Sequence, residues 1–483
     1  MNYCDHAIAL SELDRMNAIP GQDGVPLADS VSLDGFSVWH WYQDSIYESL
    51  RQGILYSPTP THVSLRSSAI FIVLGGLLFL ITIAAAISAR LRGVRVMVFS
   101  VDRTTLNGKT DQRLAAVYDA LARTQTPFVE LWHSHHPKTS LGNLCKRRRL
   151  GAYLMAFDWC FWMGEGMWHR RMGKWSEESF AEFSDPLHAH RIAQNFYLRV
   201  PLSRGRVFLL EYFCVIAGIK FIVGIDDPRN YHEIACAAKR RQIPFVVVQH
   251  GHFTKYHIGW LERYPFALPR CIPDTLVVWS NYWKNELHRL HSVFSPERIV
   301  VGGAKQTTVV PGRSSMADGL IHLVVPFETG APHSEVAPYL HALSMRDNVR
   351  IYFKLRPDES VEAQLAAYSL LPLPKNVEAV SFLPEGVRID AVVGVYSTYL
   401  YDLIAAGIPA GVLETGCDFG SGLTDNGLAV PIRFPSLEED IRLLAATTSE
   451  EVRRRQMQLC EPLDATLSTA IAGILLEHRE QKN

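Results

Sequence analysis

The chain has 483 residues, 48% of them hydrophobic and 20% charged, with a formal net charge of −1. This length exceeds what one hydrophobic core usually supports, so two or three domains are expected, and the composition places most of the chain in the ordinary globular class rather than the disordered one. The near-neutral charge argues against nucleic acid as a partner, because the basic run at 146–149 is short and no RNA-binding motif accompanies it. The eight cysteines form no CxxC pair, which argues against a zinc site or a disulfide framework and fits a reducing compartment.

An uncharged segment, AIFIVLGGLLFLITIAAAISA, runs from Ala69 to Ala89 and follows an N-terminal extension of residues 1–68. About 21 apolar residues are enough to cross a hydrocarbon core as a helix. Arginines follow the segment, whereas the first 60 residues are mainly acidic, so the positive-inside rule places the rest of the chain in the cytoplasm. We expect a transmembrane or membrane-embedded helix at 69–89; the alternative is a buried helix of the N-terminal domain.

Residues 93–310 alternate between predicted strands and helices, as in a Rossmann-like domain. Residues 141–220 interrupt the pattern with few strand signals, and we interpret them as a helical insertion. The predicted strands are VRVMVFSV, FVELWHS, KFIVGI, PFVVVQ, TLVVWS and ERIVV, and the predicted helices are DQRLAAVYDALARTQ, HEIACAAKRRQI and NYWKNELHRLH.

The alternation restarts at residue 319, after the linker GGAKQTTVVPGRSS, and continues to about residue 435. Predicted strands are LIHLVVPFETG, VRIYFKL, VEAVSFL, IDAVVGVY and PAGVLE, with a helix at YLYDLIAAG, and residues 436–483 are predicted to be helical. The fold class is therefore α/β, with two parallel-sheet domains that face a cleft and an N-terminal apolar helix. Ligands in such folds bind at the carboxyl ends of the strands, so the polar residues there are the candidates.

In the first half, two strand ends carry unusual side chains, GIDD and QHGH. Asp227 precedes a proline and is a candidate helix cap, which leaves Asp226 to accept a proton from a hydroxyl group. His250 and His252 are candidate bases or candidate hydrogen-bond donors to phosphate oxygens, and Gly251 between them is expected to allow close approach of a ligand. The alternative is that His250 only satisfies a hydrogen bond at the sheet edge. A metal is disfavoured because no carboxylate or cysteine lies at ligand spacing beside these histidines.

In the second half, the candidates suit an anionic ligand. Lys354 and Arg356 are two residues apart, so they are expected to converge on a phosphate, unless they lie on a solvated edge strand. Ser397 and Thr398 begin a predicted helix, where backbone N–H groups favour an anion, although Ser397 alone suits an N-cap. Two acids at strand ends, Glu414 and the weaker candidate Glu328, are expected to hold ribose hydroxyls.

Together these motifs resemble the GT-B glycosyltransferases of bacterial surface carbohydrate assembly, including sialyl-, polysialyl- and Kdo-transferases and CDP-glycerol glycerophosphotransferases. The resemblance covers about residues 220–415 and rests on His250-Gly251 as the HG motif and on Ser397-Thr398 as the phosphate-binding pair. The family's HP motif is altered to Arg356-Pro357, so a phosphate contact is expected there without an acid or base role.

The resemblance implies a metal-independent transferase that moves a sugar from a nucleotide-activated donor to a hydroxyl of a surface-glycan or lipid-linked acceptor. It implies a C-terminal domain that binds the donor and no further cofactor. The apolar segment 69–89 and the arginines after it add the expectation of a site at the inner membrane with the catalytic domains in the cytoplasm. Catalytic roles are expected for Asp226, His250 and His252, and donor contacts for Gly251, Glu328, Lys354, Arg356, Pro357, Ser397, Thr398 and Glu414. The alternatives are a nucleotide-sugar epimerase of the same fold and a catalytically degenerate nucleotide-binding scaffold.

Overall fold

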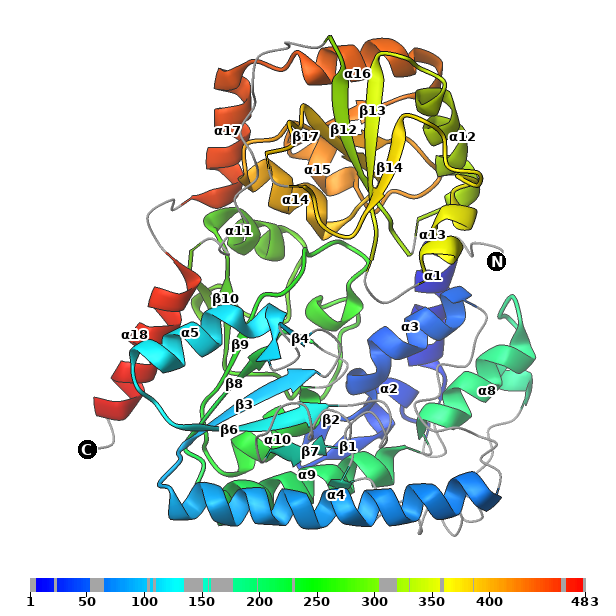
Figure 1. Cartoon of the computed structure of the whole chain (residues 1–483). Helices are drawn as coiled ribbons and strands as arrows, with labels where there is room; N and C mark the ends of the chain where they lie inside the picture. Colours follow the sequence, from blue (N-terminus) through cyan, green and yellow to red (C-terminus); the bar gives the residue numbers. More distant parts are fainter. Residues whose placement is uncertain are drawn as a thin grey trace.

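A computed structural model describes most of the chain. The described residues are 6–20, 24–52, 65–101, 105–106, 110–133, 151–154, 156–157, 177–197, 199–227, 231–303, 319–329, 331–356, 360–384, 386–461 and 466–480. Figure 1 shows two α/β units, one above the other, with the C-terminal unit at the top.

The N-terminal domain is built on a parallel sheet with the order β11-β10-β9-β8-β3-β6-β7, seven strands within the described residues. The central strands form because runs of apolar residues are buried on both faces, as parallel sheets require. The strands are β3 (Val96–Val101), β6 (Phe128–His133), β7 (Ala152–Tyr153), β8 (Phe221–Ile225), β9 (Phe245–Val248), β10 (Thr275–Val278) and β11 (Ile299–Val301). Strand β7 lies in the segment predicted to be helical, so that prediction is wrong for residues 152–153; two residues are too short for a periodic signal.

Helices cover this sheet, in agreement with the predicted alternation. They are α5 (Ala115–Arg123), α8 (Pro186–Tyr197), α9 (Val200–Ala217), α10 (His232–Arg240) and α11 (Asn281–Arg289). Short elements complete the domain: β4 (Thr105–Leu106), β5 (Thr110–Asp111), and the 3-10 turns η2 (Gln112–Leu114), η3 (Glu177–Phe180), η4 (Ile258–Trp260) and η5 (Pro296–Arg298).

The C-terminal domain has a second parallel sheet with the order β14-β13-β12-β15-β16-β17, six strands within the described residues. They are β12 (Ile321–Pro326), β13 (Val349–Lys354), β14 (Val377–Val380), β15 (Ala391–Gly394), β16 (Ala410–Leu413) and β17 (Ala429–Ile432). Strand β17 was not predicted, because AVPI contains a proline, which an edge strand tolerates. The helical elements are α12 (His333–Ser344), α13 (Val361–Ala367), α14 (Thr398–Ala405), α15 (Ser421–Asp425), η6 (Phe434–Ser436), α16 (Leu437–Ala445) and α17 (Ser449–Cys460).

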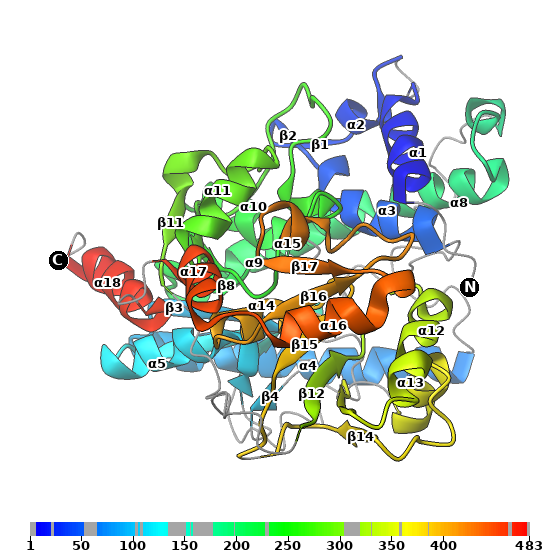
Figure 2. The ribbon, with the colours of Figure 1, turned by 90° about the horizontal axis from the view of Figure 1, so that it is seen from above.

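The last helix, α18 (Leu467–Glu480), returns to the N-terminal domain and packs on α5. The hydroxyl of Ser468 donates to the carboxylate of Asp119 at 2.5 Å, and Figures 1 and 2 both show α18 beside α5, away from α16. The end of the chain therefore ties the two domains together.

Before the first sheet, the chain forms α1 (His6–Ala18), α2 (Leu27–Ser30), β1 (Ser32–Leu33), β2 (Phe36–Ser37), η1 (Trp39–Tyr42) and α3 (Gln43–Gln52). The apolar segment then forms α4 (Leu65–Leu91), within which Val73–Leu91 is long and apolar enough to cross a membrane. An apolar helix was predicted correctly, but it is not N-terminal, because α1 to α3 precede it. The two facing Rossmann-like domains confirm the predicted fold class.

Candidate active site between the two sheets

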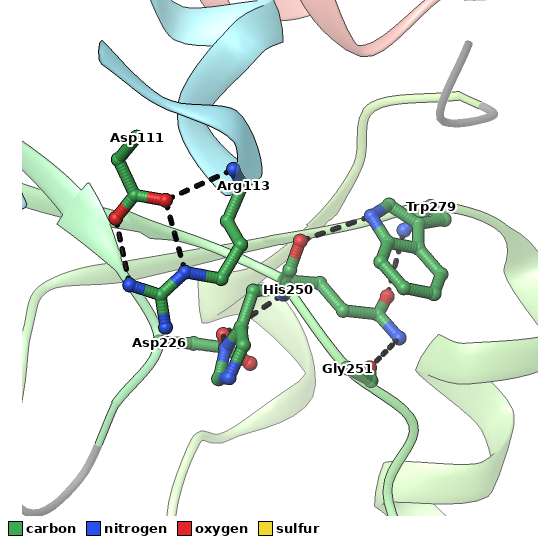
Figure 3. A network of polar contacts seen from close by, with 7 residues as sticks. Asp111, Arg113, Asp226, His250, Gly251 and Trp279 are labelled. Atoms are coloured by element: carbon green, nitrogen blue, oxygen red, sulfur yellow. Dashed lines mark hydrogen bonds and ion pairs between the residues drawn. The ribbon is translucent and has the colours of Figure 1, made fainter. Parts of the chain in front are cut away.

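Asp226 and His250 follow the neighbouring strands β8 and β9 and meet at their carboxyl ends. The Asp226 side chain is buried, and its Oδ1 accepts the backbone N–H of His250 at 2.9 Å and also pairs with the ring Nδ1. Figure 3 shows the imidazole against the carboxylate. Because Nδ1 faces Asp226, Nε2 is the ring nitrogen available to a substrate.

The electrostatics of this pair favour a proton on His250. Burial opposes the charged imidazolium, but the adjacent Asp226 carboxylate outweighs it and raises the pKa of His250 above its usual 6.5. The His250 side chain keeps 25% of its surface exposed, whereas that of Asp226 keeps 1%. Asp226 was predicted to take the proton from the acceptor itself; its burial instead makes it the residue that orients and charges His250.

Two further pairs hold this edge, and neither was predicted. On one side, Arg113 donates to Asp111 from Nε at 3.0 Å and from Nη2 at 2.7 Å, and its charge opposes protonation of His250. On the other side, where Figure 3 labels Trp279 and Gly251, the side chain of buried Gln249 accepts the backbone N–H of Trp279 at 2.9 Å and donates to the Gly251 carbonyl at 2.8 Å. A glutamine at the end of an apolar run was the available sequence signal for the second pair; the first needs the folded chain.

Neither the backbone conformation at position 251 nor the neighbouring protein atoms require a glycine there. A Cβ at this position would meet nothing within 4 Å, so the space beside Gly251 is open, and the expected close approach of a ligand stays a prediction. Asp227 does not cap α10, whose N-cap residue is Tyr231.

His252 joins the two domains. Its ring Nδ1 lies 2.9 Å from the Thr398 hydroxyl at the start of α14, and its ring stacks on Tyr401 of the same helix with centroids 5.4 Å apart. Burial, with charges on His257 and His250 adding to it, lowers the pKa of His252 well below 6.5, so the ring is neutral near pH 7. His252 therefore serves as a neutral hydrogen-bonding group between the two halves.

Glu328 fixes the loop that leads into α14. Its buried carboxylate accepts backbone N–H groups of Val395 at 2.7 Å and Tyr396 at 2.8 Å, and also that of Ser397. Burial raises the pKa of Glu328 to about 7, although these three hydrogen bonds act in the opposite direction. Glu328 was expected to hold ribose hydroxyls; in the structure its oxygens are occupied by the loop, so it positions the loop instead.

The start of α14 has the expected features. Ser397 is the N-cap residue, whose hydroxyl accepts the N–H of Tyr399 at 3.2 Å, and Thr398 is the first helical residue. Both side chains are half-buried. The positive end of this helix therefore lies beside the His252 ring.

Lys354 and Arg356 do not share one environment. The Lys354 ammonium donates to the Leu355 carbonyl at 2.8 Å and lies 5.8 Å from the Tyr399 ring centre, next to the α14 start. Burial lowers its pKa. Strand β13 ends at Lys354, so the two-residue spacing no longer places Arg356 on the same face as Lys354. The Arg356 side chain is exposed, and its backbone N–H and carbonyl are both hydrogen-bonded to the Gln364 side chain. Pro357 lies outside the described residues.

Glu414 follows β16 and is exposed, with its backbone N–H bonded to Ile432 O at 3.0 Å. Across the described part of the chain, no group of three or more His, Cys, Asp or Glu side chains is placed to hold a metal ion.

No protein-family model matches the sequence, and no curated protein matches it either. Among solved structures, the chain is similar to CalG4, the calicheamicin glycosyltransferase, with a TM-score of 0.50 and 15% identity over 80% of this chain and 98% of that one. Weaker likenesses include MurG of Acinetobacter baumannii (TM-score 0.44, 10% identity, 79% of this chain and 99% of that one). Another is the UDP-GlcNAc 2-epimerase of Methanocaldococcus jannaschii in complex with UDP-GlcNAc and UDP (TM-score 0.46, 9% identity, 80% of this chain and 100% of that one).

The similarity to CalG4 establishes the fold of this chain as GT-B. At this level of identity the comparison defines the architecture alone, and the chemistry must be argued from the site.

Proposed function

We propose that this protein is a glycosyltransferase that moves a sugar from a nucleotide-activated donor to a hydroxyl group of an acceptor. The observation that carries the proposal is the ion pair of His250 and Asp226 at the edge of the first sheet. His252, two residues after His250, contacts Thr398 at the start of α14. The proposed base therefore lies two residues from a contact with the helix start to which we assign the donor phosphate.

In the proposed step, His250 Nε2 takes the proton of the acceptor hydroxyl while the oxygen of that hydroxyl attacks the anomeric carbon of the donor. The bond between that carbon and the phosphate oxygen breaks, and the nucleotide leaves with the electron pair. Asp226 stabilises the imidazolium that forms. Base catalysis of this kind contributes about 10²- to 10⁴-fold to the rate.

The leaving phosphate is assigned to the start of α14. Thr398 and the N-terminal dipole of the helix favour an anion, and the Lys354 ammonium beside Tyr399 adds a positive charge. Arg356 and Ser397 are the further expected contacts of the phosphate, and Glu414 is the expected contact of a ribose. These groups stabilise the leaving nucleotide without a metal ion, which is the reaction type we propose.

We further propose a lipid-linked or surface-glycan acceptor and a site of action at the inner membrane. The long apolar helix α4 supports this part of the proposal.

A binding screen of CMP, CDP, UDP and GDP tests the donor site. One of these nucleotides is expected to bind the parent protein, and Arg356→Ala and Ser397→Ala are each expected to weaken its binding. If both variants bind it as the parent does, the donor site is assigned wrongly.

Product analysis separates the alternative reactions. A transferase releases free nucleotide and attaches the sugar to an acceptor, whereas an epimerase returns an isomeric nucleotide-sugar, and a scaffold binds nucleotide without turnover. Isomerised donor with no released nucleotide would replace the present proposal with the epimerase.

A further inference from the structure

Helix α4 packs against the N-terminal domain along one face. Its side chains on that face, at spacings of three and four residues, are buried: Leu78 (0% exposed), Thr82 (1%), Ala85 (1%), Ala86 (1%) and Ala89 (0%). The Thr82 hydroxyl donates to Leu78 O at 2.8 Å and accepts the backbone N–H of Tyr153 in β7 at 3.1 Å. The helix is therefore attached to the domain rather than projecting from it.

The outer face of α4 is apolar as well. Large apolar side chains are exposed along it: Val73 (69%), Leu77 (44%), Leu80 (64%), Ile83 (36%), Ile87 (49%) and Leu91 (83%). Polar residues normally occupy the outer face of a surface helix in water, and contiguous apolar patches mark an interaction surface.

The neighbouring helix α9 extends this surface. It packs directly against α4, and it exposes Phe208, Tyr212, Val215 and Ile216, each between 44% and 49%. Figure 1 shows both helices at the end of the N-terminal domain that lies opposite the C-terminal domain. We define these exposed side chains of α4 and α9 as the α4–α9 face.

The charges beside this face are positive. Arg90 and Arg92 are exposed at the C-terminal end of α4, and Arg95 and Lys220 are exposed immediately before β3 and β8. The sequence of α4 contains no acidic residue, and the Glu211 carboxylate of α9 is paired with Arg240 and Arg241. An apolar surface with a cationic border complements the acyl chains and phosphates of an anionic bilayer.

We propose that the α4–α9 face docks this protein on an anionic membrane, with α4 lying along the bilayer surface rather than spanning it. A spanning α4 would leave its buried contacts and uncover Trp132 and Tyr153, which form one apolar cluster with Leu78 and Ala156. Lying flat keeps that cluster and immerses the opposite face. This proposal does not depend on the reaction assigned above, because it uses none of the active-site residues.

Vesicle sedimentation tests the docking surface. The purified full chain is mixed with vesicles of phosphatidylcholine and phosphatidylglycerol and with vesicles of phosphatidylcholine alone. Binding is expected to the anionic vesicles, and it is expected to weaken about tenfold or more on the neutral ones. Equal binding to both, or binding to neither, overturns the proposal.

The matched variants locate the surface. Leu80→Glu with Ile87→Glu is expected to lower vesicle binding by about tenfold or more, because two immersed side chains become charged. The control, Met345→Glu with Leu443→Glu, changes two exposed apolar residues of the C-terminal domain, 72% and 57% exposed, and is expected to bind as the parent does. If instead the α4 variant turns a dimer into a monomer in ultracentrifugation and keeps vesicle binding, the face is an interface between two copies.

Labelling distinguishes lying from spanning. Val73→Cys and Leu91→Cys are each reacted, on sealed vesicles, with a membrane-impermeant maleimide, and the parent chain gives the background from the native cysteines. Because both side chains belong to the immersed face, both ends are expected to be shielded on intact vesicles and to gain labelling to the same extent when detergent dissolves them. If one end reacts fully on intact vesicles and the other only after the detergent is added, α4 spans the bilayer and the proposal fails.

Discussion

The Oδ1 atom of Asp226 contacts both the backbone N–H and the imidazole Nδ1 of His250, so one carboxylate oxygen fixes the position and the charge of one histidine. The contact joins the ends of two adjacent parallel strands, β8 and β9. It leaves His250 Nε2 directed away from Asp226, as a base at the edge of a sheet requires.

The His250–Asp226 pair predicts the pH dependence of the reaction. A base must be neutral, and Asp226 raises the pKa of His250, so kcat/KM should rise with pH through a value above 6.5. Asp226→Asn removes the negative charge and should move this rise to lower pH, while kcat falls about 10²-fold or more because the imidazolium loses its partner. Initial rates from pH 5 to 9 for both proteins check this. If Asp226→Asn leaves the pH at which kcat/KM rises unchanged, His250 is not the base.

Glu328→Gln is predicted to destabilise the C-terminal domain by about 1–3 kcal/mol at pH 7, because the amide group cannot accept all three loop N–H groups. Chemical unfolding measures it. The control is Glu335→Gln, whose exposed carboxylate accepts only one described loop N–H, from Gly416 at 2.5 Å, and should cost less than about 1 kcal/mol. Equal losses for the two variants would show that Glu328 does not hold the loop.

The stability of the parent should also depend on pH through Glu328. Its pKa is about 7 in the folded chain and 4.5 is the ordinary value, so between these values the folded chain keeps a proton that the unfolded chain has lost. Stability from this group is therefore greatest below pH 4.5 and decreases as pH rises to 7, by about 3 kcal/mol at most. The difference in unfolding free energy between parent and Glu328→Gln should shrink over this window; a difference that is constant with pH contradicts the assignment.

Thr398→Val is predicted to raise the donor KM about fivefold, because it removes the hydroxyl that His252 contacts across the domain boundary while keeping the side-chain shape. Steady-state kinetics with varied donor measures the change. In the control, Thr424→Val, the lost hydroxyl bonds only Ser421 O within the described residues of the same domain, and KM should stay unchanged. A similar change in both variants would argue against a specific role for the contact with His252.

Substitution by alanine is predicted to affect stability at one glycine and not at another. Gly251→Ala should change the unfolding free energy by less than about 0.5 kcal/mol, since the new Cβ would enter open space. If a ligand occupies that space, the same Cβ would raise KM. Gly420→Ala should destabilise the fold by about 3 kcal/mol or more, because its Cβ would lie 1.9 Å from the Val395 carbonyl oxygen. Thermal unfolding of both variants tests this contrast, and a stable Gly420→Ala protein would contradict it.

The order of strands and helices could be predicted because parallel strands are continuous apolar runs and their helices have a period of about four residues. The ends of β8, β9 and β15 could be located for the same reason, and with them Asp226, His250 and Thr398. The contacts between distant parts of the chain could not be predicted. Glu328 contacts residues 395–397, and His252 contacts Thr398, and only the folded chain brings these positions together. Likewise, composition predicts an apolar helix at α4, but only its packing on β7 shows which face remains exposed.

The most direct test is transfer by the purified full chain and by His250→Ala, measured as release of nucleotide and labelling of acceptor from the nucleotide-sugar that matches the nucleotide bound in the screen. The parent is expected to transfer the sugar, and His250→Ala is expected to bind the donor with unchanged affinity and to transfer it at least about 100-fold more slowly. Transfer by His250→Ala at the parent rate, or binding of donor by the parent without any transfer, would contradict the account.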